Sequence, residues 1–340
     1  MPPQHQVTLA QVAEAAGVSI ATASRAINGS TRKVSEEIRV RVTQTAEELG
    51  YLPNLSAQTV VKGASPTVAV LVSDIADPYF SAISSGIMAA ARQAGLMVTM
   101  ATSERRSADE RDMIRTFRSQ RPRAIVVVGS RWDQDPQAAA IEEQLAAYQQ
   151  AGGRVVLVSQ GPSPFDLVEI QNFEGAKALA HALVDQGGQR FGVAVGYRRL
   201  RTNADRLAGF TQGLAERSIT LKEEAVAEAA FTRDGGYAAM RQLLERGVEL
   251  DTVFAASDLM AFGAATAMRE AGVQPGAQIG LAGFDNIALT EDVTPALTTV
   301  DAPLGEIGRR AMDLALSEGT EPRTVEVPTS VILRASTPRR

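Results

Sequence analysis

A short segment near the N-terminus carries side chains that suit contacts with a DNA duplex. Arg25 can donate two hydrogen bonds to a guanine edge, and the apolar Ile20 and Ala21 suit contact with a thymine methyl. Short hydroxyl and amide side chains bond phosphate oxygens and so fix a protein's register on DNA. Those in this segment are Ser19, Thr22, Ser24 and Asn28. The pattern indicates a helix that reads base edges, and an ordinary small helical bundle without DNA is the alternative.

The helix signals around this segment predict the fold that would position it. Thr8 and Gln11 form a capping box, in which each side chain satisfies a backbone N–H at the start of a helix. Gly17 breaks that helix, and a second helix is expected over Ile20–Asn28. A third is expected over residues 35–50, and the three together are helix-turn-helix geometry. The buried stripe of the third helix is Ile38, Val42, Ala46 and Leu49.

The composition of the 340-residue chain excludes several kinds of chemistry. There are no cysteines, so disulfides, thiol catalysis and cysteine-ligated zinc are excluded. The only two histidines are His5, in a polar N-terminal tail, and His181, in the middle of a predicted helix, and these positions argue against a metal cluster or a histidine-based triad. We therefore expect no metal and no cofactor. The sequence shows no signal segment and no apolar run that approaches a membrane span, so a cytoplasmic location away from membranes is expected.

Beyond residue 66 the chain alternates apolar, β-branched runs with amphipathic helices. The runs expected to form strands are Val68–Val72, Leu96–Met100, Ala124–Val128, Val155–Val158, Phe191–Val195, Thr252–Ala256 and Ile279–Phe284. Continuous apolar strands separated by helices indicate a parallel sheet covered on both faces. One sheet would need too many strands, so we predict an all-α helix-turn-helix head and an α/β core of two doubly wound lobes. Ligands of such cores bind at the carboxyl ends of the strands, where the lobes face each other.

The predicted strand ends carry polar and aromatic side chains without a catalytic motif. The sequence has no glycine-rich dinucleotide fingerprint, no phosphate loop and no Gly-x-Ser-x-Gly elbow, so we expect a protein that is not an enzyme. Aromatic faces beside scattered hydrogen-bonding groups suit reversible capture of a polar small molecule. Taken singly, each residue could instead be a helix cap or an ordinary loop residue. The residues concerned are Asp74, Asp77–Phe80, Ser130–Trp132, Ser159, Gln160, Ser257, Asp258, Asp285 and Asn286.

A series of segments in order along the chain resembles the lactose/galactose-repressor (LacI/GalR) family. They are residues 7–19, 22–29, 34–35, 48–54, 205–210, 283–285, 297–300, 307–308 and 333–337. The resemblance implies a sequence-specific DNA-binding transcriptional regulator that binds double-stranded, pseudo-palindromic operator DNA as a homodimer. It also implies that the core resembles periplasmic sugar-binding proteins and binds a small-molecule effector between its lobes.

The same resemblance sets the domain boundaries, with three crossings of the chain between the lobes. The expected parts are a head (1–50), a hinge helix or linker (51–65), lobe one (66–163 and 300–323) and lobe two (164–299 and 324–340). The segment Asn54–Lys62 is too short for a stable isolated helix, so we expect it to fold on operator DNA beside its dimer mate. A plain linker is the alternative. Val60 stands where the family usually has a leucine that wedges between minor-groove base steps. The further DNA contacts expected in the head and hinge are Thr8, Asn54 and Ala57.

By resemblance, ten residues would contact the effector. Arg206 would donate a fork of hydrogen bonds to hydroxyls or a carboxylate, or would instead form an ion pair that stabilises its lobe. Asp285 would accept from a vicinal diol. Ser159 stands where a sugar-binding aspartate is common, which leaves a nucleoside, a modified sugar or a polyol open beside a hexose. The residues that would stack on a ring are Phe80, Trp132 and Phe231. The remaining expected contacts are Tyr79, Ser130, Thr202 and Ser257.

Effector binding would bias closure of the lobes, and closure would alter the spacing of the hinge helices and the affinity for the operator. Such couplings are typically ~1–3 kcal/mol. Whether the effector is an inducer or a corepressor stays open. Two rival classes share the core: a solute-binding transport protein, which should have a signal segment and no head, and a sugar- or nucleoside-modifying enzyme, which should have a catalytic motif.

Overall fold

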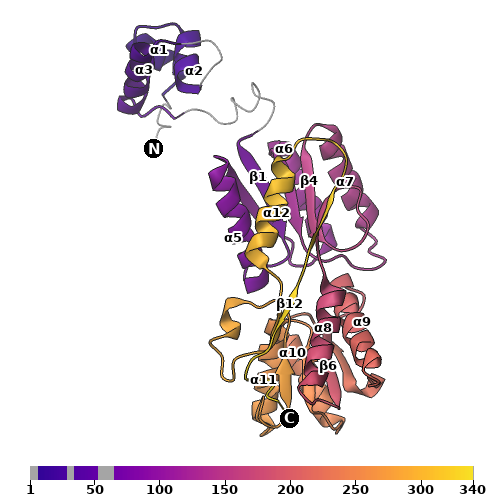
Figure 1. Cartoon of the computed structure of the whole chain (residues 1–340). Helices are drawn as coiled ribbons and strands as arrows, with labels where there is room; N and C mark the ends of the chain where they lie inside the picture. Colours follow the sequence, from indigo (N-terminus) through magenta and orange to yellow (C-terminus); the bar gives the residue numbers. More distant parts are fainter. Residues whose placement is uncertain (1–6, 29–33, 53–64, 340) are drawn as a thin grey trace, which may run out of the picture. The chain divides into compact units, whose positions relative to one another are not determined.

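The computed structural model describes residues 7–28, 34–52 and 65–339 of the chain (Figure 1). The chain divides into two compact units, Met1–Ser65 and Pro66–Arg340. The expected DNA contacts of the hinge, Asn54, Ala57 and Val60, lie outside the described residues. Among the helices of the described ranges, none combines the length and the hydropathy that a membrane-spanning segment requires.

The described part of the N-terminal unit is a bundle of three short helices. These are α1 (Leu9–Ala15), α2 (Ile20–Asn28) and α3 (Glu36–Glu48). Their small core consists of Val12, Ala13, Ala16, Ala23, Ala26, Val42 and Ala46. Alanines fill much of this core, so α1, α2 and α3 pack closely in the predicted helix-turn-helix arrangement.

The helix ends of the N-terminal unit agree with those predicted from the sequence, except at the end of α3. The Gln11 N–H donates to the Thr8 hydroxyl at 3.4 Å and the Thr8 N–H donates to the Gln11 side-chain oxygen Oε1 at 2.8 Å, so the capping box is confirmed. The predicted burial of Leu49 is wrong, because its side chain is 40% exposed. Leu49 is already the C-cap, and Gly50, with φ of 68°, turns the chain away from the helix axis.

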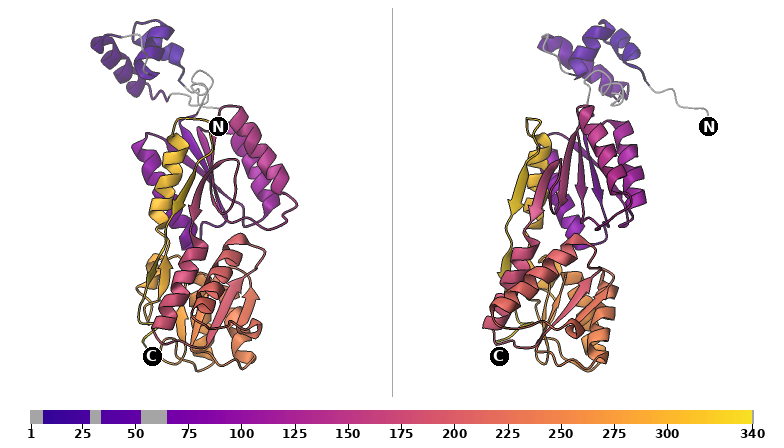
Figure 2. Two further views of the ribbon diagram at one scale, coloured as in Figure 1. Left: turned by 45° about the vertical axis from the view of Figure 1, so that its right-hand side comes forward. Right: turned by 90° about the vertical axis from the view of Figure 1, so that its right-hand side faces the viewer.

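The first lobe of the core is a six-stranded parallel sheet in the order β11-β5-β4-β3-β1-β2. Its strands are β1 (Thr67–Val72), β2 (Met97–Thr102), β3 (Ala124–Val128), β4 (Arg154–Ser159), β5 (Asp166–Ile170) and β11 (Thr324–Val327). Its helices are α5 (Pro78–Gln93), α6 (Ser107–Gln120), α7 (Ala138–Gln150) and α12 (Leu304–Leu316). Successive residues of a strand face opposite sides of a sheet, so Val70 packs toward α5 and α12 and Leu71 packs toward α6 and α7. Figure 2 shows the sheet between these two layers of helices.

The second lobe repeats this design around a four-stranded parallel sheet in the order β7-β6-β8-β9. Its strands are β6 (Phe191–Gly196), β7 (Val226–Ala229), β8 (Thr252–Ala255) and β9 (Gly280–Ala282). Its helices are α8 (Asn172–Asp185), α9 (Arg201–Glu216), α10 (Arg233–Glu245) and α11 (Asp258–Glu270), with 3₁₀ turns at Glu223–Ala225 and Ala288–Thr290. The helices α10 and α11 approach closely because Gly263 has no side chain: a Cβ there would lie 1.8 Å from the Arg233 carbonyl oxygen.

The chain crosses between the lobes three times, but two crossings come later than expected. β5 pairs with β4, and β11 pairs with β5, so residues 164–170 and 324–327 belong to lobe one rather than lobe two. These pairings correct the expected boundaries after residues 163 and 323. Two strands of the crossing segments, β10 (Thr299–Asp301) and β12 (Ser330–Ile332), form a short antiparallel ladder.

Candidate functional site

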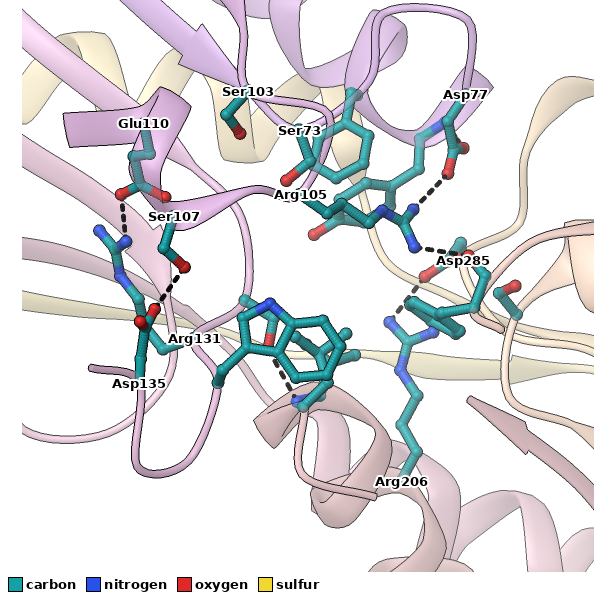
Figure 3. Close-up of a pocket in the computed structure, with 18 residues that line it drawn as sticks. Ser73, Asp77, Ser103, Arg105, Ser107, Glu110, Arg131, Asp135, Arg206 and Asp285 are labelled. Atoms are coloured by element: carbon teal, nitrogen blue, oxygen red, sulfur yellow. Dashed lines mark hydrogen bonds and ion pairs between the residues drawn. The ribbon is translucent and has the colours of Figure 1, made fainter. Parts of the chain in front are cut away.

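A cavity lies between the two lobes at the carboxyl ends of their strands (Figure 3). Polar and aromatic side chains from both lobes line it, as is usual for sites that bind small polar molecules. Nine of the ten expected effector contacts line it: Tyr79, Phe80, Ser130, Trp132, Thr202, Arg206, Phe231, Ser257 and Asp285. The other lining residues are Ser73, Asp77, Ser103, Arg105, Ser107, Glu110, Arg131, Asp135 and Leu200.

Arg206, in the second turn of α9, is only 1% exposed, and each of its three guanidinium nitrogens donates to a protein oxygen. Its guanidinium donates to Asn172 Oδ1 at 2.8 Å, to the Ala256 carbonyl at 2.6 Å and to Asp285 Oδ1 at 2.7 Å. The Phe284 ring lies 3.7 Å away on the guanidinium face. The hydrogen bonds that Arg206 was expected to donate to an effector are therefore directed at protein atoms. This agrees with the alternative, an ion pair that stabilises the second lobe.

The carboxyl group of Asp285 lies at the floor of the cavity, in a backbone conformation that the surrounding loop enforces. Burial raises the pKa of Asp285 to about 6, although the Arg206 guanidinium opposes this rise. Its φ of 113° lies outside the ordinary range of a non-glycine residue. The buried Asp258 holds the same loop, because it accepts from the Ile287 N–H at 2.9 Å and from the Thr299 hydroxyl at 2.6 Å. Burial also raises the pKa of Asp258.

Helix caps place two more of the expected residues at the cavity. The Asp77 carboxylate accepts from the Tyr79 N–H at 3.0 Å, so Asp77 caps α5 as its sequence position suggests. At α11 the cap is Ser257, whose hydroxyl accepts from the Met260 N–H at 3.3 Å, and not Asp258. Each cap therefore brings a polar side chain to a strand end that faces the other lobe.

Sequence reasoning missed Arg105, which reaches from the first lobe to the second. Arg105 follows β2 with φ of 60°, donates to the Phe231 carbonyl at 2.5 Å and lies 3.4 Å from the Asp77 carboxylate. Its guanidinium also lies 5.9 Å from the Phe80 ring centre and 5.4 Å from that of Phe231. Burial lowers the pKa of Arg105 and raises that of Asp77. Arg105 was not expected from the sequence because it lies in a run of charged residues, which is typical of an exposed loop.

The turn after β3 joins the lobes at the cavity mouth. The Thr202 N–H donates to the Ser130 hydroxyl at 3.0 Å, and that hydroxyl donates to Gln160 Oε1 at 3.1 Å. The Asp133 N–H donates to the Arg199 carbonyl at 2.7 Å. These bonds connect a loop of lobe one directly to the start of α9, so the two lobes are in contact around the cavity.

Ser159 does not line this cavity. It ends β4 on the same face as Leu157, and Val158 between them faces α5 and α12, because strand side chains alternate. Ser159 therefore lies on the α7 side of the sheet, where it lines a neighbouring cavity that also contains Leu157. Its hydroxyl is buried and has no hydrogen-bond partner among the described residues.

Apart from Thr8, which caps α1, the expected DNA contacts of the described head lie on α2 or directly before it. Those with exposed side chains are Thr8, Ser19, Ile20 and Ala21, and those with half-buried side chains are Thr22, Ser24 and Arg25. Asn28 is the last residue of α2. The Ser19 hydroxyl accepts from the Thr22 N–H at 3.2 Å, so it caps α2 while remaining at the surface. In the described residues no cluster of three His, Asp or Glu side chains is arranged to hold a metal ion.

The chain combines an N-terminal helix-turn-helix unit with a two-lobed α/β core that has a cavity between facing strand ends. This combination defines a class of DNA-binding proteins that also bind a ligand. Two family models match the chain in agreement with this architecture. Residues 8–54 match the model of bacterial regulatory proteins of the lacI family. Residues 180–337 match that of the periplasmic binding protein-like domain.

Individual relatives match over nearly the whole chain. The regulator CelR of Thermobifida fusca is 32% identical, with 97% of this chain and 98% of that protein covered. The repressor CytR of Escherichia coli is 34% identical, with 92% and 89% covered. Among solved structures, the Lac repressor dimer bound to operator and the anti-inducer ONPF has a TM-score of 0.84 at 25% identity, with 98% and 99% covered. A CelR–cellobiose complex has a TM-score of 0.71 at 29% identity, with 97% and 100% covered.

The chain belongs to the LacI family of bacterial regulatory proteins. It is a DNA-binding transcriptional regulator with an effector-binding core, and the family relationship agrees with both the head and the interlobe cavity.

Proposed function

We propose that this regulator responds to a sugar or a related polyhydroxylated molecule bound in the interlobe cavity. The composition of the cavity lining carries the proposal. The carboxyl groups of Asp77 and Asp285 and the guanidinium of Arg105 offer acceptors and donors for ring hydroxyls. Phe231 and Trp132 add aromatic faces, which suit the apolar face of a sugar ring. The CelR–cellobiose complex supports the same ligand class, since its protein resembles this chain over almost its full length.

The cavity also suggests how binding would reach the DNA. Arg105 and the 130–133 turn extend from lobe one onto lobe two, so a ligand between the lobes alters the contacts that set their closure. A ligand shifts a conformational equilibrium only through its different affinity for the two states. The coupling to operator affinity is therefore expected to be ~1–3 kcal/mol, or about 5- to 150-fold. The regulator acts by binding alone in this proposal, without catalysis.

A homodimer is the assembly that fits operator DNA with two half-sites. The first lobe offers a surface for it, because β2 is an edge strand of the sheet. Met97 on β2 is 62% exposed and Met88 on α5 is 47% exposed, so both offer apolar side chains that a second copy would cover. Replacing Met97 with glutamate should convert the dimer to a monomer in light scattering. An unchanged dimer mass would place the interface elsewhere.

The effector proposal is tested by operator binding at fixed salt. An operator is first selected from random duplex DNA, and its affinity is then measured by fluorescence anisotropy with a panel of sugars, polyols and nucleosides. At least one sugar or polyol should change the affinity by 5-fold or more in either direction. The Asp285→Asn variant should lose this response. The exposed Asp292, in the same lobe, provides a matched control as Asp292→Asn, which should keep the response. If no sugar or polyol of the panel changes operator affinity, the proposal fails.

A further inference from the structure

The interlobe cavity has two polar ends, as Figure 3 shows. The near end comprises Asp77, Arg105, Arg206 and Asp285, and the far end comprises Ser107, Glu110, Arg131 and Asp135. All eight residues line one continuous cavity. The far end contains none of the ten residues expected from the sequence, so a ligand that used only those residues would leave it empty.

The two ends have the same chemistry but a different origin. Each combines carboxylates with an arginine: Glu110 pairs with Arg131 at the far end, and Asp285 pairs with Arg206 at the near end. The near end takes residues from both lobes. The far end belongs to lobe one alone, because Glu110 lies in the first turn of α6 and Asp135 lies in the loop before α7.

The far end is held rigidly by the protein. The Ser107 hydroxyl donates to Asp135 Oδ2 at 2.5 Å, and the Gln137 N–H donates to Asp135 Oδ1 at 2.8 Å. Arg111 links α6 to the same loop, since it donates to Gln137 Oε1 at 3.1 Å. The Asp135 carboxylate is therefore fixed in position before a ligand arrives, which lowers the entropic cost of binding.

Trp132 provides an aromatic surface beside the far end. It is half-buried and lines the cavity, and its ring centre lies 6.2 Å from that of Tyr197 across the lobe boundary at an interplanar angle of 37°. A β-bridge between Trp132 and Leu200 fixes its backbone. An aromatic plane next to fixed carboxylates is the arrangement that binds a ring with hydroxyl groups on its edge.

We propose that the effector has two linked, hydroxylated rings, as in a disaccharide. One ring occupies the near end, and the second ring lies at the far end, against Trp132 and within reach of Asp135, Glu110 and Arg131. This inference rests on the proposed function, and it makes lobe one the part that selects for the second ring. A single-ring ligand engages the near end only and forgoes every far-end hydrogen bond.

The test measures dissociation constants by isothermal titration calorimetry on the full chain. The probes are four disaccharides (cellobiose, gentiobiose, maltose and lactose), their component monosaccharides glucose and galactose, and the nucleosides adenosine and cytidine. The tightest disaccharide should bind at least tenfold more tightly than any single-ring sugar or nucleoside, since hydrogen bonds to charged groups discriminate by about this factor. The inference is overturned if a single-ring sugar or a nucleoside binds as tightly, or if no disaccharide binds.

The variant Asp135→Asn tests whether the tighter binding of a disaccharide comes from contacts at the far end. It should weaken disaccharide binding about tenfold and leave the dissociation constant of the component monosaccharide unchanged. Equal weakening of both ligands would indicate a general structural effect and overturn the assignment. Glu143→Gln on α7 is the control that also removes a carboxylate of lobe one, because Glu143 is exposed and does not line the cavity. If a monosaccharide alone alters operator affinity, this inference falls while the proposed function stands. If no sugar or polyol alters operator affinity, the proposed function falls.

Discussion

Replacing Arg206 with methionine tests what holds the second lobe together at the cavity. The substitution keeps most of the side-chain volume but removes the charge and three hydrogen bonds, to Asn172, Ala256 and Asp285. It also leaves the Asp285 carboxyl group buried without its cation. Breaking a buried pair in this way costs about 3–5 kcal/mol of unfolding free energy. For a unit of this size the midpoint of thermal unfolding should fall by roughly 6–20 °C.

Circular dichroism during heating and in urea measures the change. The double variant Arg206→Met with Asp285→Asn should recover part of the loss, because no uncompensated buried charge remains. Arg241→Met is the control, since Arg241 forms an exposed pair with Glu245 and its replacement should leave the unfolding free energy almost unchanged. Additive effects of the two cavity substitutions, or a loss below about 1 kcal/mol for Arg206→Met, would refute the reasoning.

The pH dependence of Arg206→Met gives an independent check. Asp285 has a pKa of about 6, against an ordinary value of 3.8, and removing Arg206 raises the pKa further. A folded-state pKa above the unfolded value means that protonation stabilises the fold. This stabilisation is fully present below pH ~4 and is lost as the pH rises through 6 and above. The variant should therefore approach the parent protein in stability near pH 4.5 and fall furthest behind at pH 8. An equal deficit at both pH values would contradict the buried-charge explanation.

Three further substitutions test other parts of the molecule. Arg25→Ala should weaken binding to a selected operator by ~1–3 kcal/mol per contacted base, and unchanged selectivity over random duplex in anisotropy would exclude Arg25 from base reading. Arg105→Ala removes a contact between the lobes, so calorimetry should show at least tenfold weaker effector binding, and an unchanged dissociation constant would count against its role. Gly86→Val should destabilise lobe one by several kcal/mol in urea unfolding, because a Cβ at Gly86 would lie 2.2 Å from the Gly305 carbonyl oxygen. A change in unfolding free energy below about 1 kcal/mol would show instead that α5 and α12 can separate.

The sequence predicts the strands whose own residues form an apolar run, but not a strand such as β5, whose residues include charged side chains. All seven expected apolar runs contribute a strand, including Val68–Val72 within β1. The strand β5 was missed because Asp166 and Glu169 interrupt its apolar pattern. In the fold, the Arg154 side chain donates to Asp166 at 2.8 Å and the Gly161 N–H donates to Glu169 at 2.8 Å. Only tertiary partners make these acids compatible with a strand, and a single sequence does not show them.

The candidate site shows the same division between local and tertiary information. Residues next to strand ends, such as Tyr79 and Asp285, could be found because the topology brings strand ends together. Arg105, Ser107 and Glu110 could not, since an acidic first turn of α6 has the ordinary composition of an exposed helix start. Ser159 was placed in the cavity although the period of two along β4 puts it on the opposite face.

The three crossings between the lobes restrict how the core can move. They lie next to one another, because the Gln171 N–H donates to the Val327 carbonyl at 3.1 Å and β10 is paired with β12. Three adjacent covalent connections resist sliding and twisting of one lobe against the other, and they leave rotation about a line through the connections as the soft motion. We therefore expect effectors of different shape to differ mainly in how far they rotate one lobe against the other.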